Sequence, residues 1–313
     1  ADFVMAVLPV WPQCACLRRR PPDLPPGEGL RRIRRAQTLA QTGRRRDVEQ
    51  AEDFRQETRA LHGLVASLAP GTCDEPTQFK GWTIADVIRH LHFWNRMAHF
   101  QLSDPDALTA HLKQMAKRAI PMRAYEAEQL GHLAPADLVA EWAGFAETAA
   151  DLFAAADPRA RLRWAGPDMS ARSSITARLM ETWAHGQEVY DHAGVVRKNH
   201  DRVGNIVTLG VNTFGWTYAA RGEKPPGPMP YLVLTAPSGG IWTHGEPSQT
   251  ERIEGLAEDF CQVVTQTRNI ADTTLKVTGP VATDWMSKAQ CFAGAPNPPP
   301  AAGTRFTRKA GAP

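Results

Sequence analysis

Two stretches of the sequence hold residues whose types and spacing suit a catalytic metal ion. Glu181 and His185 are four positions apart, so in a helix their side chains lie one turn apart on the same face and can reach one ion. His90, in a separate stretch, could supply a third ligand. One carboxylate and two imidazoles form a three-ligand site with an open coordination position, which is typical of catalytic metal sites.

The helical position of His90 separates it from two neighbouring histidines. At about 100° of rotation per residue, His90 shares one stripe of its helix with Val87 and Trp94. His92 and His99 fall on the opposite stripe, so we expect them to face solvent. A histidine on an apolar stripe is more often a hydrogen-bonded core residue than a metal ligand, so this helix alone does not establish a site.

A row of ionisable side chains runs along the helix that carries Glu181 and His185. Such a row is usually solvated surface. Here, however, the residues beside the row are bulky and apolar: Leu179, Met180, Trp183 and Tyr190. They indicate a largely enclosed helix, in which a buried glutamate or histidine needs a partner. The pattern therefore favours a site in the interior.

The elements that would position these residues are long helices. Thr83 can cap one of them, with Asp86 completing an approximate capping box, and Pro135 suits the first turn of another. The spacing of apolar side chains predicts helices over residues 47–68, 83–102, 108–130 with a break at Pro121, 135–155 and 173–192. The four unbroken helices among these, joined by modest connections, predict a bundle over residues 47–200.

The second half of the chain has a different pattern. Two short apolar runs, residues 231–235 and 241–244, flank a Gly-containing turn and predict a β-hairpin. Further helices are expected over residues 201–220, 253–267 and 282–292, with a strand over 274–277. Residues 201–294 are therefore predicted to form a small α+β domain. The predicted fold class of the whole chain is α+β, mostly α.

Charge is unevenly distributed along the chain. Ten of the 36 Lys and Arg residues, but three of the 33 Asp and Glu residues, lie in residues 1–46. The rest of the chain is mildly acidic, and a nucleic-acid-binding protein needs a basic face on its folded part, so nucleic acid is not an expected partner. Residues 1–46, rich in Arg and Pro, are expected to be a disordered leader from a misassigned start or a processed precursor, and residues 295–313 a flexible tail.

The sequence argues against several classes of protein. No stretch has the roughly 18 consecutive apolar residues that a transmembrane helix needs, so no membrane association is expected. Five scattered cysteines fit a reducing cytoplasm better than a disulfide framework. The sequence has no phosphate-binding loop, dinucleotide-binding turn, HExxH helix or GxSxG elbow. Nucleotide-driven, standard zinc-protease and α/β-hydrolase functions are therefore not expected.

The two metal-site stretches resemble the signatures of one family. Residues 81–91, from Gly-Trp-Thr to His90-Leu, look like the first signature of the DinB-like superfamily, in particular its mycothiol-dependent maleylpyruvate isomerase branch. Residues 178–186 resemble the second signature, Glu-x-x-x-His on the last helix of the bundle. The resemblance covers about residues 47–294 and implies a DinB-like four-helix bundle followed by a small C-terminal domain. It places the family's metal ligands on His90, Glu181 and His185.

The resemblance also implies a chemistry. A divalent ion, zinc on the basis of its ligands, would activate the thiol of mycothiol as a cosubstrate. The thiolate would attack a small electrophilic substrate, giving isomerisation or an S-conjugate. Glu188, where the family commonly has Asp, is the candidate either to support a metal ligand or to transfer a proton. Trp94 and Trp183 are expected to be pocket walls or core residues. DinB-like bundles often dimerise, so a homodimer is one expected assembly.

Two other functions remain open from the sequence. A metal-dependent hydrolase would use the same ion to activate water and would need no thiol. A non-catalytic binding or regulatory scaffold would have a closed ligand shell or no metal. The residues alone do not separate a thiol-dependent enzyme from a hydrolase, because one ion can activate either nucleophile.

Overall fold

Helices dominate the computed structural model, which describes residues 48–309. The predicted leader, residues 1–46, lies outside the described residues. Long helices and two small sheets confirm the predicted α+β, mostly-α fold class. Within the described part of the chain, none of the helices combines the length and the apolar character needed to cross a membrane.

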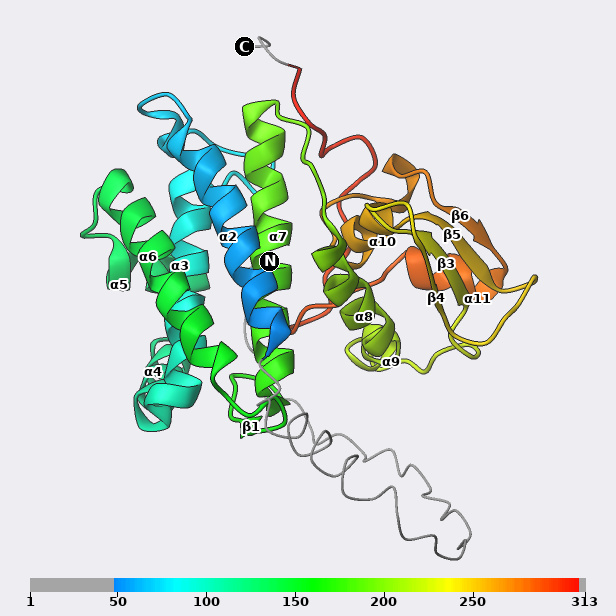
Figure 1. The fold of residues 1–313 in the computed structure, drawn as a ribbon, viewed down its shortest axis with the longest axis horizontal. Helices are drawn as coiled ribbons and strands as arrows, with labels where there is room; N and C mark the ends of the chain where they lie inside the picture. The colour runs from blue at the N-terminus through cyan, green and yellow to red at the C-terminus, as the bar shows by residue number, and fades with distance from the viewer. Residues whose placement is uncertain (1–47, 310–313) are drawn as a thin grey trace, which may run out of the picture.

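The first half of the described chain is built around four long helices that pack against one another (Figure 1). They are α2 (Glu49–Ala66), α3 (Ile84–Ser103), α6 (Pro135–Ala154) and α7 (Ala171–Ala193). α2 and α3 each contact both α6 and α7. The three predicted ligands therefore lie on two helices, α3 and α7, that are direct neighbours.

The first turn of α3 is fixed by the predicted capping box. Thr83 Oγ1 accepts a hydrogen bond from the Asp86 amide at 3.0 Å, and Asp86 Oδ2 accepts one from the Thr83 amide at 3.1 Å. These bonds satisfy amide groups that the start of a helix leaves without partners. They set where α3 begins, and therefore the direction in which His90 projects.

Two shorter helices connect α3 to α6. They are α4 (Pro105–Arg118) and α5 (Met122–Leu130), and the break between them at Pro121 is the one predicted. α5 packs against α3, and its Tyr125 is buried in an apolar cluster with Trp94 of α3. The middle of α5 consequently lies beside the part of α3 that carries His90.

α7 is shared between the two halves of the molecule. It follows a short antiparallel hairpin, β1 (Arg161–Leu162) with β2 (Met169–Ser170), and ends before Gly194, which has φ of +68°. Met180 and Trp183 of α7 are buried in one apolar core with residues of the C-terminal region. One face of α7 thus belongs to the bundle and another to the C-terminal region.

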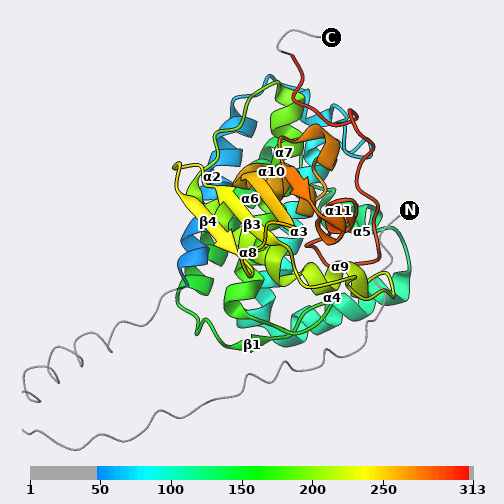
Figure 2. The same cartoon turned by 90° about the vertical axis from the view of Figure 1, so that its right-hand side faces the viewer.

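The C-terminal region is built around a four-stranded sheet in the order β4-β3-β5-β6, whose strands are labelled in Figure 1; Figure 2 shows the sheet from a second direction. β3 and β5 are parallel, and the other neighbours are antiparallel. α10 contacts β3 and β5, while α8 contacts α10 and α7, so these two helices connect the sheet to the bundle. The elements are η2 (Asp201–Val203), α8 (Gly204–Asn212), α9 (Phe214–Ala219), β3 (Tyr231–Thr235), β4 (Ile241–His244), β5 (Arg252–Leu256), α10 (Ala257–Val264), η3 (Ile270–Asp272), β6 (Lys276–Thr278) and α11 (Pro280–Met286).

Three helices predicted in the C-terminal region are wrong in extent. The last of them, predicted over residues 282–292, is the short helix α11, which begins at Pro280 and ends at Met286. Residues 253–267 are not one helix, because residues up to Leu256 belong to strand β5 and α10 begins at Ala257. β5 is a central strand paired with β3 and β6, and this pairing with distant residues overrides the local helical spacing of its apolar side chains. Residues 201–220 divide into η2, α8 and α9, with an interruption at Thr213.

The segment predicted to be a flexible tail contains no helix or strand over its described residues, 295–309. It runs from the C-terminal region back past α7 (Figure 1). The Thr307 hydroxyl donates to Asp191 Oδ1 at 2.9 Å, and the Arg308 amide donates to the Asp191 carbonyl at 2.9 Å. These bonds attach the segment to the end of α7.

Candidate metal centre

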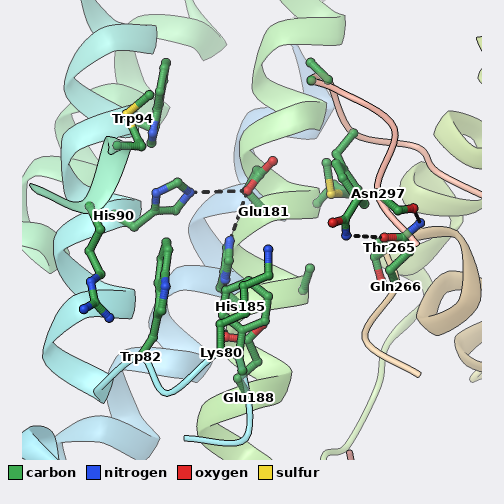
Figure 3. A pocket seen from close by; sticks show the side chains of 18 of the residues that line it. Lys80, Trp82, His90, Trp94, Glu181, His185, Glu188, Thr265, Gln266 and Asn297 are labelled. Atoms are coloured by element: carbon green, nitrogen blue, oxygen red, sulfur yellow. Dashed lines mark hydrogen bonds and ion pairs between the residues drawn. The ribbon is translucent and has the colours of Figure 1, made fainter. Parts of the chain in front are cut away.

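The structure brings the three predicted ligands together between α3 and α7 (Figure 3). His90 Nε2 lies 3.7 Å from Glu181 Oε2, and His185 Nε2 lies 3.4 Å from the same oxygen. One ligand atom from each residue lies within 4.8 Å of the other two. Tetrahedral zinc, with bonds of about 2.0–2.1 Å, keeps its ligand atoms roughly 3.3 Å apart. The observed separations therefore suit a single ion with small side-chain adjustments.

A carboxylate lies behind each imidazole. His90 Nδ1 donates to Glu126 Oε1 at 2.8 Å, and His185 Nδ1 lies 3.4 Å from Glu188 Oε2. Such a partner at Nδ1 fixes the ring and its tautomer, and leaves the Nε2 lone pair available to a metal. The donor set and its orientation therefore fit a divalent ion.

Glu126 is a site residue that the sequence analysis does not single out. It is fully buried on α5, and its Oε1 also accepts from Trp94 Nε1 at 3.0 Å. Its other oxygen, Oε2, has no hydrogen-bond partner among the described residues. A signal does exist in the sequence, because Glu126 lies one helical turn from both Met122 and Leu130 and so shares their stripe. A glutamate on an apolar stripe indicates a buried partner.

Without a metal ion, the charges of the site are strongly coupled. Burial opposes a charge on His185, yet the neighbouring Glu188 and Glu181 carboxylates raise the pKa of His185 to about 10. Burial likewise opposes the Glu181 carboxylate, but hydrogen bonds from His185 and His90 hold its pKa well below the ordinary value. For Glu188 the burial effect dominates and raises the pKa. At neutral pH the metal-free site therefore holds a proton on His185.

Metal binding is expected to weaken as the pH falls. His185 must release its proton, because only the neutral imidazole is a ligand. The pKa of His185, about 10, lies above neutral pH. Burial opposes a charge on His90, but the Glu126 carboxylate raises the pKa of this histidine as well. The apparent metal affinity should therefore rise at least about tenfold per pH unit between about pH 6 and pH 8. Competition against a chromophoric chelator at several pH values measures this slope. An affinity independent of pH would contradict a role for His185 as ligand.

Loss of the Glu126 carboxylate is expected to weaken metal binding by about 10–100-fold, the usual effect of removing a group that orients a ligand histidine. Glu126→Gln retains an oxygen that can accept from His90, so its effect should be smaller than that of Glu126→Ala. The same competition titration provides the measurement, with Glu128→Ala, exposed on the same helix, as control. Wild-type affinity in Glu126→Ala would mean that His90 needs no orienting partner.

The three predicted ligands line a cavity of about 930 Å³ between the bundle and the C-terminal region. On the bundle side, the Trp82 ring lies nearly parallel to that of His185, with 5.8 Å between centroids. The C-terminal region contributes polar side chains opposite them, among them Thr265, Gln266 and Asn297 (Figure 3). A volume of this size is typical of pockets that hold small molecules.

The other residues proposed for the pocket divide between the cavity and the core. Glu188 and Trp94 line the cavity. Trp183 is fully buried among apolar residues of the C-terminal region, and its Nε1 donates to Asn199 Oδ1 at 3.0 Å. Trp183 is therefore a core residue and not a pocket wall.

The expectation that His92 faces solvent is wrong. His92 is 3% exposed, and its ring lies 5.6 Å from that of Phe145 on α6. α6 covers this side of α3, and the stripe pattern of one helix does not show which of its faces another helix will cover. His99, on the same side, is partly exposed.

The family model of the mycothiol maleylpyruvate isomerase N-terminal domain matches residues 54–190, which include the three predicted ligands. Two relatives, described as uncharacterized proteins of two strains of Mycobacterium tuberculosis, are 38% identical over 246 residues, covering 78% of this chain and 95% of each relative. Crystal structures of the mycothiol-dependent maleylpyruvate isomerase and of a mutant of it have TM-scores of 0.45 and 0.43 and 16% identity. The match to each crystal structure covers 69% of this chain and 87% of the chain in that structure.

Proposed function

This chain belongs to the mycothiol maleylpyruvate isomerase N-terminal domain family, and from that premise we propose that it is a divalent-metal enzyme that uses a low-molecular-weight thiol. Zinc is the proposed ion and mycothiol the proposed thiol. The substrate is a small electrophile, and the reaction is isomerisation or transfer of the thiol sulfur to the substrate.

The observation that carries this proposal is the convergence of His90, Glu181 and His185 at the wall of a large cavity. Their ligand atoms lie within 4.8 Å of one another, and the adjoining cavity of about 930 Å³ gives access to the point on which they converge. A structural metal site is closed by four protein ligands, whereas a catalytic site has three and an open position. Three ligands facing a cavity support a catalytic role.

In the proposed reaction, His90, Glu181 and His185 hold the ion, while Glu126 and Glu188 orient the two imidazoles. When bound, a divalent ion supplies Lewis acidity that lowers the pKa of a thiol at the open position. Phe79 and Trp82 both contact the His185 ring, with centroids 5.2 and 5.8 Å away. Their apolar surfaces limit the access of water to the site.

Glu188 is the proposed group for proton transfer. Its Oε2 lies 3.4 Å from His185 Nδ1 and it lines the cavity, so it lies within reach of both the ligand ring and a bound molecule. Burial raises the pKa of Glu188, which makes a proton on this carboxyl easier to hold near neutral pH. Glu188 can then accept the thiol proton and return it at the end of the reaction.

The proposal is tested by assaying metal-loaded and chelator-stripped protein with maleylpyruvate in the presence and absence of mycothiol. We expect cis-trans isomerisation or an S-conjugate, resolved by NMR and mass spectrometry, in samples that contain both metal and thiol. Hydrolytic turnover without thiol would favour the hydrolase alternative. Failure to bind zinc at all would favour the scaffold alternative.

A further inference from the structure

Arg178 is a buried arginine that faces the same cavity as the proposed metal ligands. It lies on α7, one turn before Glu181, so the two side chains project from neighbouring positions of one helical face. Its side chain is almost fully enclosed, with 4% of the residue exposed, and it forms part of the cavity wall. A guanidinium in this position is within reach of a molecule bound beside the metal site.

The hydrogen bonds of Arg178 leave most of its donors uncommitted. Its Nε donates to Asn95 Oδ1 at 3.0 Å, and one Nη lies 3.5 Å from the Leu91 carbonyl, at the limit of a hydrogen bond. Among the described residues, no carboxylate forms an ion pair with it. A guanidinium has five N–H donors, and a buried charge without an ionic partner is costly. The free donors therefore point to an anionic partner that the protein itself does not provide.

The other strongly buried arginines of the described chain are paired differently. Arg268 donates to both oxygens of Asp191, at 2.7 and 2.6 Å, and Arg197 donates to the buried Glu57. Around Arg178, by contrast, burial lowers the pKa of the guanidinium to about 10 although Glu181 and Glu126 act to raise it. The Glu181 and Glu126 carboxylates thus offset part of the free-energy cost of burying the Arg178 charge. Neither of them forms an ion pair with the guanidinium.

We propose that Arg178 is a catalytic residue that binds an oxygen atom of the electrophilic substrate and stabilises the negative charge that forms there. The inference rests on the proposed function. As the thiol sulfur bonds to a carbon of a double bond conjugated to a carbonyl, the π electrons move onto the carbonyl oxygen, where Arg178 donates hydrogen bonds to the resulting enolate. Rotation about the new single bond follows, and the enolate electrons reform the double bond and expel the thiolate. No oxidant or reductant is needed.

The anion site can be tested apart from turnover, with maleate as the probe. Maleate binding to zinc-loaded protein, without thiol, is followed by the fluorescence of the cavity tryptophans. We expect Arg178→Gln to bind maleate about 10–100-fold more weakly than wild type, the usual range for a lost charge-assisted hydrogen bond. Arg178→Lys retains the positive charge, so its affinity for maleate should lie between those of wild type and Arg178→Gln. Arg172→Gln, exposed on the first turn of the same helix, is the matched control and should bind like wild type.

Metal content, measured on the same samples, separates a substrate role from support of the ligands. Unchanged zinc content in Arg178→Gln together with weakened maleate binding supports the proposal. Wild-type maleate affinity in zinc-loaded Arg178→Gln would overturn it, as would a wild-type protein that does not bind maleate. The binding assay contains no thiol, so its result does not depend on the proposed thiol chemistry. If maleate binding depends on Arg178 but no thiol-dependent turnover is found, the anion site is supported and the proposed function is rejected.

Discussion

Substitution of His185 by alanine is expected to abolish both zinc binding and thiol-dependent turnover. His185 is one of the three proposed ligands, and its Nε2 lies 3.4 Å from Glu181 Oε2. Two remaining ligands cannot hold an ion with useful affinity, so the loss should exceed the roughly 10–100-fold effect of removing an orienting group such as Glu126. Plasma mass spectrometry of protein purified without chelator should find about one zinc ion per wild-type chain and none in His185→Ala.

Two further variants make this result specific to the site. Glu181→Gln preserves the shape of its side chain but replaces a carboxylate by an amide, which is a poor zinc ligand, so it should lose metal as well. His132→Ala removes a histidine that is exposed in the turn before α6 and should keep its metal. Circular dichroism establishes that each variant is folded. Equal zinc content in His185→Ala and wild type would refute the proposed ligand set.

The convergence of His90, Glu181 and His185 could be predicted from the sequence, because the direction of each side chain depends on local helix geometry. Glu181 and His185 are one turn apart on α7, and His90 lies on the apolar stripe of α3. Both helices begin and end close to the predicted residues, and the capping box that fixes the start of α3 is readable in the sequence. Local signals of this kind determine which way a side chain projects from its own helix. These local signals do not show which residues of other elements the side chain contacts.

What the sequence could not provide comes from contacts between distant segments. Glu126 reaches His90 because α5 folds back onto α3, and a stripe analysis of α3 alone cannot show this. The apolar pattern of α3 predicts a solvent-facing His92 because it carries no information on α6, whose Phe145 contacts the His92 ring. Gln266 lies beside the cavity because α10 and the loop after it dock against α7, a packing that depends on the whole C-terminal region. The cavity is therefore a product of tertiary assembly.

Asp191→Ala is expected to give the largest loss of stability among these substitutions, about 3–5 kcal/mol. Asp191 is 3% exposed at the end of α7 and accepts two bonds from Arg268, at 2.7 and 2.6 Å. It also accepts from Gln187 at 3.0 Å and from Thr307 at 2.9 Å. Removing the carboxylate leaves the Arg268 cation buried without its partner, which costs far more than the loss of one exposed ion pair. Chemical denaturation at neutral pH measures the free energy of unfolding.

Asp151→Ala is the matched control, because its carboxylate also bonds an arginine, Arg55, at 2.6 Å, but 75% of its side chain is exposed. An exposed pair is worth about 0–1 kcal/mol, so the two alanine variants should differ severalfold in destabilisation. Replacing both partners, Asp191→Ala with Arg268→Met, should recover part of the loss, because no unpaired charge is then buried. If Asp191→Ala and Asp151→Ala lowered the free energy of unfolding equally, burial would not determine how much the Asp191–Arg268 pair contributes to stability. Asp191 also accepts a hydrogen bond from Thr307. It therefore attaches α7 to the C-terminal segment, whose Asn297 and Arg305 line the cavity.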